Sequence, residues 1–396
     1  MAVVALNWEL GADWGHIARF LPIALGLRER GHEPVLLLRD LSRAHALFAT
    51  HGIECLQAPL WLRQVTGLPA EINLTETLFR FGFLEPEGLM SNIAAWRALW
   101  KRIGAQLLVC DHAPTALLAA RGLGQPTVVI GNSFAVPPLA APLPPYRWWM
   151  AHGSQHGRLA ETDRRLVYAA NRALAAFGAP PLHSACDLWR VPQRYICGVP
   201  ALDVYGERAG ATYIGAINQP DAGEPPRWPE GEGPKLFAYL KPSYRHFDAA
   251  LDALAAAPAR VLAYAPGVPA ATEHRHRGRV VFSPRPLRMA EVCAQADLGL
   301  CHAGGTTELL LHAGKPVLLL PMQMEQTMTA RRAEATGACL HQPMNGDADA
   351  LRERVNRLVT DPALARAARC TADEQPPRKS GLDMLLQGCC EALGPG

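Results

Sequence analysis

The sequence has few of the features that mark membrane proteins and nucleic-acid-binding proteins. Its 396 residues contain no run approaching the ~18 consecutive apolar residues of a membrane-spanning helix. The net charge is only +3, there is no block of like charge, and five of the 39 basic residues are lysines. These absences argue against an integral membrane span and against nucleic acid as the main partner, while peripheral contact with a membrane stays open.

The sequence also lacks the marks of a secreted or zinc-ribbon protein. Its ten cysteines include no CxxC pair. The opening residues, MAVVALNWEL, carry no basic segment before their short apolar run, so they are typical of a strand and not of a signal peptide. We therefore expect a cytoplasmic protein whose cysteines are reduced and mostly pack in the core, without a metal site.

The chain alternates short apolar runs with amphipathic stretches, which predicts α/β structure with mostly parallel sheets covered on both faces. Its length fits about two domains. The Pro-, Gly- and acid-rich segment 219–234 is predicted to be the linker. We expect an N-terminal domain over 1–218, a C-terminal domain over 235–378, and a last helix over 379–396 that packs back on the N-terminal domain. Ligands of such sheets bind at the carboxyl ends of strands, so the natural site is a cleft between two domains.

The segment 298–340 carries the most informative pattern. An apolar strand leads into His302, then Gly304, Gly305, Thr306 and Thr307, and then a helix. Glycines let main-chain N–H groups approach an anion, and a helix N-terminus favours negative charge. The turn matches neither GxxxxGK[ST] nor GxGxxG, so ordinary NTPase and dinucleotide sites are not supported. On these residues alone, a phosphate-binding turn and a simple capped strand–helix turn both stay open.

The residues that follow extend this pattern. Gly314 and Pro316 end the helix, a buried strand follows, and Pro321 precedes the pair Glu325-Gln326. The order resembles the donor signature of GT-B glycosyltransferases of the UDP-glycosyltransferase and macrolide glycosyltransferase type, and the two-domain layout extends the resemblance over the whole chain. It implies a GT-B fold, with two Rossmann-like, doubly wound domains facing a cleft. In this fold the domain over 1–218 would bind the acceptor, and the domain over 235–378 would bind the nucleotide sugar.

The resemblance also implies roles on the donor side. His302 and the amides of Gly304, Gly305, Thr306 and Thr307 would hold a diphosphate. Glu325 and Gln326 would bind sugar hydroxyls, while Pro286 and Leu287 would lie beside the nucleotide base. Glu308 is a further donor-side candidate, one residue away from the family's usual ribose-binding glutamate, which leaves its ribose contact open.

The N-terminal part supplies a candidate base. His16 follows the loop after the first strand and begins a helix that ends in Arg30-Gly31-His32. Histidine titrates near neutrality and suits proton abstraction from a hydroxyl. This order also resembles the family's N-terminus, where the first histidine is the base, and Asp111 matches the aspartate that orients it. Asp111 could equally cap the helix that begins near Ala113.

Aromatic residues give the only indication of the acceptor. All nine tryptophans lie between Trp8 and Trp228. Aromatic side chains supply large apolar area with few rotatable bonds. Acceptor-binding candidates in this part are Trp14, Phe134, Trp148 and Trp149, and they favour a bulky, partly apolar alcohol or phenol.

One motif is set aside. Asp347-Ala348-Asp349 has the form of a metal-binding DxD, but it begins a helix, where acidic residues stabilise the N-terminus. We interpret it as a cap.

Together these patterns predict an inverting, metal-independent glycosyltransferase. It would move a sugar from a UDP- or dTDP-sugar co-substrate to a hydroxyl of a small-molecule or lipid acceptor, with no tightly bound cofactor. Two alternatives stay open: a sugar-nucleotide epimerase of the same fold, and a non-catalytic nucleotide-sugar-binding activator. The oligomeric state is not indicated by the sequence.

Overall fold

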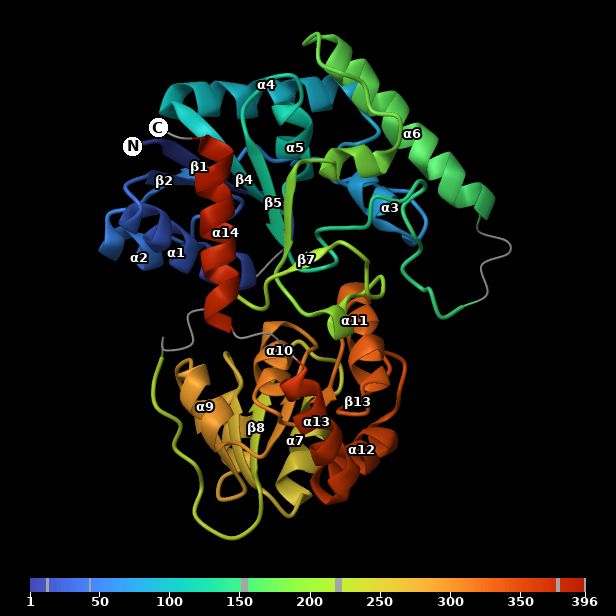
Figure 1. Cartoon of the computed structure of the whole chain (residues 1–396). Coiled ribbons are helices and arrows are strands. Elements are labelled where there is room, and N and C mark those ends of the chain that lie inside the picture. The colour runs from blue at the N-terminus through green and yellow to red at the C-terminus, as the bar shows by residue number, and fades with distance from the viewer. Residues whose placement is uncertain (12–13, 43, 151–155, 218–222, 375–377, 395–396) are drawn as a thin grey trace. The chain divides into compact units, whose positions relative to one another are not determined.

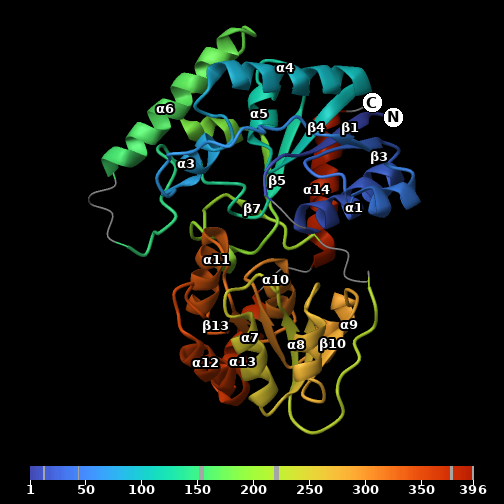
Figure 2. The same cartoon turned by 180° about the vertical axis from the view of Figure 1, so that it is seen from behind.

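The computed structural model describes residues 1–11, 14–42, 44–150, 156–217, 223–374 and 378–394, and it leaves out the side chains of residues 14, 45–46 and 378–380. The chain divides into two compact units. Unit 1 contains residues 1–198, 207–218 and 377–396, and unit 2 contains residues 199–206 and 219–376. Each unit is an α/β structure built on its own parallel sheet (Figures 1 and 2).

The sheet of unit 1 has seven strands in the order β3-β2-β1-β4-β5-β6-β7, and every pair of neighbours is parallel. The strands are β1 (Val3–Trp8), β2 (Glu33–Leu38), β3 (Glu54–Gln57), β4 (Ala105–Asp111), β5 (Thr127–Gly131), β6 (Gln193–Ile196) and β7 (Thr212–Tyr213). The helices are α1 (Trp14–Glu29), α2 (Ala44–Phe48), α3 (Leu74–Phe79), α4 (Pro86–Ile103), α5 (Pro114–Ala120), α6 (His156–Ala175) and α14 (Arg378–Leu393), with short 3₁₀ turns at Ala49–His51 and Ala185–Trp189.

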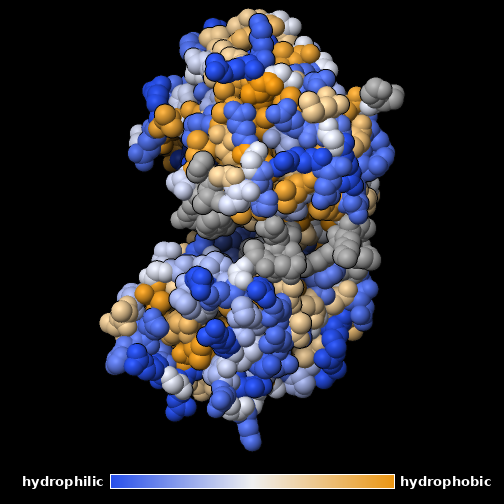
Figure 3. Space-filling view, turned by 90° about the vertical axis from the view of Figure 1, so that its left-hand side faces the viewer, coloured by the Kyte–Doolittle hydropathy of each residue, from blue (hydrophilic) through white to orange (hydrophobic). Residues whose placement is uncertain are grey.

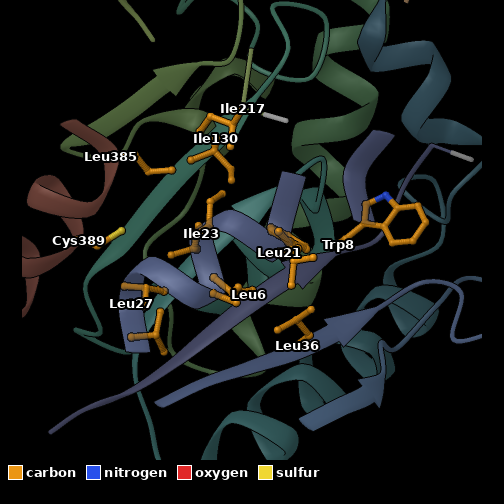
Figure 4. Packing of buried hydrophobic residues seen from close by; sticks show 14 of the residues in the cluster. Leu6, Trp8, Leu21, Ile23, Leu27, Leu36, Ile130, Ile217, Leu385 and Cys389 are labelled. Atoms are coloured by element: carbon orange, nitrogen blue, oxygen red, sulfur yellow. The ribbon is translucent and has the colours of Figure 1, made fainter. Parts of the chain in front are cut away.

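The core of unit 1 follows the alternation of side chains along its strands. Leu6 and Trp8 of β1 face one side, where they are buried with residues of α1 and α14. Figure 4 shows Leu385 and Cys389 of α14 directed into this cluster. Asn7 points to the other side, where its side-chain oxygen accepts a hydrogen bond from Trp100 of α4 at 2.9 Å. The last helix of the chain is therefore an integral layer of unit 1.

The sheet of unit 2 has six parallel strands in the order β10-β9-β8-β11-β12-β13. The strands are β8 (Lys235–Tyr239), β9 (Arg260–Tyr264), β10 (Val280–Ser283), β11 (Leu298–Cys301), β12 (Val317–Leu319) and β13 (Cys339–His341). The helices are α7 (Phe247–Ala256), α8 (Ala270–Arg275), α9 (Met289–Gln295), α10 (Gly305–His312), α11 (Met324–Ala335), α12 (Ala348–Thr360) and α13 (Pro362–Asp373), and a 3₁₀ turn covers Pro200–Leu202. Two separate apolar clusters, one on each face, hold these helices to the sheet.

The proline-rich segment predicted to be a linker has an ordered part. Residues 219–222 lie outside the described part of the chain, but 223–234 pack on unit 2. The Glu224 N–H donates to the carbonyl of Pro286 at 2.8 Å, and the Trp228 indole donates to Gln295 at 2.9 Å. Gly223 has a φ of +120°, and a Cβ there would lie 2.5 Å from the Pro286 carbonyl oxygen. This segment therefore supports the loop that follows β10.

Local sequence signals fix several helix ends. Helix α4 begins with Pro86 in its first turn and ends at Gly104, whose φ is +67°. The Asp347 side chain caps α12 by accepting from the Ala350 N–H at 2.7 Å, which confirms the interpretation of this motif as a cap. Before α2, which begins at Ala44, the Ser42 N–H donates to the carboxylate of Asp40 at 2.8 Å.

Both sheets are doubly wound, because the chain order reverses at one point in each. In unit 1 the reversal lies between β1 and β4, and in unit 2 between β8 and β11. In such sheets ligands bind outside the carboxyl ends of the strands at this switch point. His16 lies in α1, the helix that follows β1, and Asp111 is the last residue of β4. His302 directly follows β11.

Among the described residues, no helix is long and apolar enough to cross a bilayer. On the face of unit 2 drawn in Figure 3, hydrophobic residues are interspersed with hydrophilic ones.

Candidate active site

His16 and Asp111 form a hydrogen-bonded pair at the switch point of unit 1. His16 lies in the first turn of α1, and its Nδ1 is 2.9 Å from Oδ2 of Asp111, the last residue of β4. Arg19, one turn further along α1, donates to the same oxygen at 2.6 Å. Asp111 is fully buried, yet the charge of Arg19 and the hydrogen bond from His16 outweigh its burial and hold its pKa well below its usual range.

This arrangement fixes the tautomer of His16. An ionised carboxylate can only accept, so Nδ1 of His16 carries the proton and donates it to Asp111. Nε2 then keeps its lone pair and can accept a proton from a hydroxyl. Of the two alternatives for Asp111, the structure contains the bond to His16. Helix α5 has no side-chain bond from its N-cap residue Ala113.

Two further residues hold the His16 ring. The indole of Trp8 stacks on it, with centroids 5.2 Å apart and planes at 18°. Gly11 has a φ of +90°, and a Cβ there would lie 2.6 Å from Nε2 of His16. Only glycine accommodates both the left-handed backbone and the close approach of the ring. The loop after β1 is therefore shaped around this imidazole.

Sequence reasoning missed Glu9, which lies next to this pair. Its carboxylate accepts from the main-chain N–H of Thr115 at 2.8 Å and also bonds to the Thr115 hydroxyl, so it caps helix α5. Glu9 is almost fully buried, and desolvation raises its pKa to about 7. Since 106 residues separate the partners, no local pattern could have shown this cap.

A second histidine, His112, was also missed. It directly follows Asp111 and has a φ of +47°, a left-handed conformation that is rare outside glycine. Its ring lies edge-on to His16, with centroids 6.0 Å apart, and 6.1 Å from the ring of Phe134. Burial and the neighbouring His16 lower its pKa to about 3, so the imidazole is neutral at physiological pH. The only available signal was its place after a buried strand beside Asp111.

The predicted acceptor residues fall into three groups. Phe134 is buried and stacks on Tyr146 with centroids 5.2 Å apart, beside His112. Trp148 and Trp149 are half-buried and meet edge-to-face at 5.4 Å, just after the proline-containing stretch 137–145. Trp14 begins α1, but its side chain lies outside the described part of the chain. The structure therefore brings Phe134 close to His112, whose ring in turn contacts His16.

On unit 2, His302 bridges two strand ends at the switch point. The main-chain N–H of Lys241, after β8, donates to its Nε2 at 2.8 Å. Nδ1 lies 2.7 Å from the carbonyl of Leu320, after β12, and therefore donates to it. Burial lowers the pKa of His302 to about 4, which leaves the ring neutral. Both nitrogens thus bond to main chain, so this geometry positions the turn that follows and offers a diphosphate no ring N–H.

The turn after His302 exposes main chain. Ala303 adopts a φ of +54°, and α10 begins after Gly304 without a side-chain cap. Gly304 and Gly305 are exposed, and a Cβ at either would meet nothing within 4 Å. Uncapped N–H groups at a helix N-terminus are a ready site for an anion.

The two threonines of this turn differ. Thr306 is half-buried, whereas Thr307 is completely buried and its hydroxyl lies 3.2 Å from the Cys301 sulfur. The Thr307 side chain is therefore part of the core, and only its main chain lies in the turn. Glu308, in the first turn of α10, is half-buried.

The remaining donor-side candidates lie on neighbouring segments. Glu325 and Gln326 are half-buried in the first turn of α11, where the Gln326 side-chain oxygen accepts from the Met322 N–H at 2.8 Å. This bond leaves the Gln326 NH₂ group as its donor. After β10, Pro286 is exposed, but Leu287 is buried in the core, so its side chain does not reach solvent.

The described residues contain no group of three or more His, Cys, Asp or Glu side chains placed to hold a metal ion.

The pair of doubly wound parallel sheets is the architecture of the GT-B glycosyltransferases, which confirms the predicted fold. No protein-family model matches the chain. Two solved structures illustrate the likeness. That of the glycosyltransferase of kitacinnamycin has a TM-score of 0.67 and 18% identity, with 98% of each chain covered. That of the spinosyn rhamnosyltransferase SpnG complexed with spinosyn aglycone has a TM-score of 0.65 and 16% identity, covering 97% of this chain and 100% of that one.

Curated relatives are also named as glycosyltransferases. The PGL/p-HBAD biosynthesis glycosyltransferase of Mycobacterium tuberculosis is 25% identical over 326 residues, which are 77% of this chain and 75% of that protein. The NDP-glycosyltransferase YjiC of Bacillus licheniformis is 39% identical over 78 residues, 19% of this chain and 20% of that protein. A solved structure of SpnG complexed with thymidine diphosphate has a TM-score of 0.63 and 16% identity, covering 98% of this chain and 99% of that one. The prediction that the chain is a glycosyltransferase is thereby confirmed.

Proposed function

We propose that this glycosyltransferase transfers a sugar, with inversion and without a metal ion, from a dTDP- or UDP-sugar to a hydroxyl of a bulky, partly apolar acceptor. The observation that carries the proposal is the buried pair of His16 and Asp111, whose geometry leaves Nε2 of His16 as a base. The acceptor class is supported by the aromatic residues near His112 and by neighbours such as SpnG, which binds spinosyn aglycone.

In the proposed reaction, Nε2 of His16 takes the proton of the acceptor hydroxyl as its oxygen attacks the anomeric carbon of the sugar. The bond between that carbon and the diphosphate oxygen breaks, and the nucleoside diphosphate leaves on the opposite face. Asp111 stabilises the imidazolium that forms, and Arg19 keeps Asp111 ionised. The proton on His16 is then released to solvent.

The leaving diphosphate needs stabilisation of its growing negative charge. We assign this task to the main-chain N–H groups of Gly304, Gly305 and Thr306 and to the N-terminus of α10. His302 contributes by fixing the strand ends that carry this turn. A thymidine base is supported by SpnG, which binds thymidine diphosphate, and a uridine base is the alternative.

The sugar and the base have their own candidate residues. Glu325 and the Gln326 NH₂ group would bind sugar hydroxyls, and the exposed Pro286 would lie beside the base. Thr307 and Leu287, whose side chains are buried, would contribute through their main chain, and the half-buried Glu308 is a candidate for the ribose. Trp148 and Trp149, with Phe134, would line the acceptor site. We propose the cytoplasm as the compartment, which suits the ten free cysteines.

The first experiment measures transfer. Wild-type protein, His16→Ala and the matched control His274→Ala, an exposed histidine of unit 2, are incubated with dTDP-glucose or UDP-glucose and 4-methylumbelliferone. We expect His16→Ala to lower kcat by about 10²- to 10⁴-fold, as for loss of a general base, and His274→Ala to leave it unchanged. Retention of most transfer by folded His16→Ala would remove the base assignment.

The second experiment separates the alternatives. A thermal-shift panel of dTDP-, UDP- and GDP-sugars identifies the base, because a ligand that binds only the folded state raises its stability. Incubation with the donor sugar alone then tests for isomers, which an epimerase would form and a transferase would not. Binding of a donor with neither transfer nor isomer would favour the non-catalytic activator.

A further inference from the structure

His112 occupies an unusual position that the proposed reaction does not yet use. It follows the buried carboxylate Asp111 and holds a φ of +47°. Such left-handed conformations cost free energy in residues other than glycine, and they cluster at functional sites. The carbonyl of His112 accepts a hydrogen bond from the Leu10 N–H at 2.9 Å, so the strained residue ties the loop after β1 to the end of β4.

The ring of His112 lies between the base and an aromatic wall. It meets the ring of His16 edge-on, with centroids 6.0 Å apart and planes at 87°. Its centroid is also 6.1 Å from that of Phe134, which in turn stacks on Tyr146. A molecule whose hydroxyl meets Nε2 of His16 and whose apolar body packs on Phe134 therefore passes the His112 ring.

The ring can also form hydrogen bonds of its own. It is half-buried, and within the described ranges no hydrogen bond joins its nitrogens to another residue. Because burial keeps it neutral, one nitrogen donates and the other accepts. A neutral imidazole suits an oxygen that is neither charged nor due to lose its proton.

We propose that His112 is a specificity-determining residue that hydrogen-bonds a second oxygen of the acceptor, adjacent to the hydroxyl that His16 deprotonates. The acceptor class that follows is a compound with neighbouring oxygens, such as a catechol, a vicinal diol or a hydroxy-ketone. This inference rests on the proposed function and deepens it, because it names what distinguishes one apolar alcohol from another.

The test compares two acceptors that differ by one hydroxyl. They are 7-hydroxy-4-methylcoumarin and 7,8-dihydroxy-4-methylcoumarin, each with dTDP-glucose or UDP-glucose, whichever the wild type uses. The measured quantity is the ratio of kcat/KM for the dihydroxy to the monohydroxy compound. This ratio does not depend on the amount of folded enzyme, so a partly unfolded variant still reports.

Three variants separate hydrogen bonding from shape and strain. His112→Asn keeps polar groups and tolerates the left-handed backbone, His112→Gly removes the side chain without strain, and His112→Phe keeps an aromatic ring without nitrogen. We expect the wild-type ratio to fall about tenfold in His112→Gly and His112→Phe, as for loss of one hydrogen bond, and to fall less in His112→Asn.

The outcomes distinguish this inference from the proposed function. An unchanged ratio in His112→Gly and His112→Phe, or a wild type without preference for the dihydroxy compound, overturns the role of His112 and leaves the transferase intact. If the wild type binds the donor but transfers sugar to neither coumarin, both the proposed function and the role of His112 are wrong for phenolic acceptors. Donor binding, measured by thermal shift, should be equal in all three variants because His112 lies in unit 1.

Discussion

The candidate sites of the two units are built from different chemical groups: side chains in unit 1 and main chain in unit 2. In unit 1 the chemistry lies in charged and titratable side chains: Asp111, Arg19 and His16 form one buried hydrogen-bonded group. In unit 2 the candidate anion site is main chain: an uncapped helix start, two exposed glycines and a neutral histidine whose nitrogens both bond to backbone. Both sites lie at the switch point of a parallel sheet, so the difference is not one of topology.

The contrast follows from the two tasks. A proton acceptor must change its charge during the reaction, so it needs a titratable group and a partner that stabilises the charged form. A diphosphate carries its charge throughout, and fixed N–H dipoles stabilise it without titrating. Each of the following variants disrupts the candidate site of one unit and leaves that of the other intact.

The largest effect is expected for Asp111→Asn. An amide no longer holds the proton on Nδ1 of His16 and no longer stabilises the imidazolium, so kcat should fall by about 10³- to 10⁴-fold. Affinity for dTDP-glucose, measured by calorimetry, should be unchanged, because the proposed donor residues lie in unit 2. A kcat within tenfold of the wild type in a folded variant would show that Asp111 serves stability alone.

Gly11→Ala should have the next largest effect. Its Cβ would lie 2.6 Å from Nε2 of His16, in a backbone with a φ of +90°. Displacement of the ring should lower kcat by about 10- to 100-fold. Gly31→Ala is the matched control, since Gly31 also has a positive φ of +79° but no neighbour within 4 Å of its Cβ.

The Gly31→Ala control separates the effect of the steric clash with His16 from the effect of the backbone strain. Gly31→Ala should cost about 1 kcal/mol of stability and leave kcat unchanged. Equal kcat values for Gly11→Ala and Gly31→Ala would mean that the loop after β1 does not position His16.

The fold and part of each site were predictable because they depend on periodic patterns and strand ends. Alternating apolar runs predicted the strands, and the glycines after β11 indicated a candidate anion-binding turn because they stand between a strand and a helix. The pairing of Asp111 with His16 was implied by the resemblance to the GT-B glycosyltransferases, and their places after β1 and at the end of β4 agree with it.

The remaining residues depend on properties that no local pattern records. Arg19 is one of 34 arginines (39 basic residues less five lysines), and only the phase of α1 places it on Asp111. The phase of α10 likewise sends the Thr307 hydroxyl into the core while Thr306 stays near the surface. The positive φ of His112 and the neutral state of His302 arise from tertiary contacts.

On the side of unit 2, Gly304→Ala tests whether the ligand occupies the space above the turn. Gly304 has a φ of −110°, which alanine adopts, and a Cβ would meet nothing within 4 Å. Stability should therefore be unchanged, whereas affinity for dTDP-glucose should fall about tenfold because the methyl group keeps the diphosphate from the N–H groups. Gly157→Ala, in the first turn of α6 with no neighbour at its Cβ, is the control. Full affinity in Gly304→Ala would place the diphosphate elsewhere.

The smallest effect is expected for His302→Gln, in which an amide replaces the imidazole and can keep both main-chain bonds. If His302 is a neutral support, dTDP-glucose affinity should change by no more than about threefold and should be flat between about pH 6 and 8, because the pKa of His302 is already lowered to about 4.

The free energy of unfolding, unlike the affinity for dTDP-glucose, should depend on pH because of His302. The unfolded chain binds a proton at the ordinary histidine pKa of 6.5, and the folded chain does so only near 4. Below pH 6.5 the unfolded state therefore binds more protons, so wild-type stability falls as the pH drops towards 4, by about 3 kcal/mol from this group. His302→Gln should lose this part of the acid sensitivity, measured by urea unfolding at each pH. If His302 instead binds the diphosphate as a cation, wild-type affinity for dTDP-glucose will decline as the pH rises through 6.5, and the glutamine variant will bind weakly at every pH.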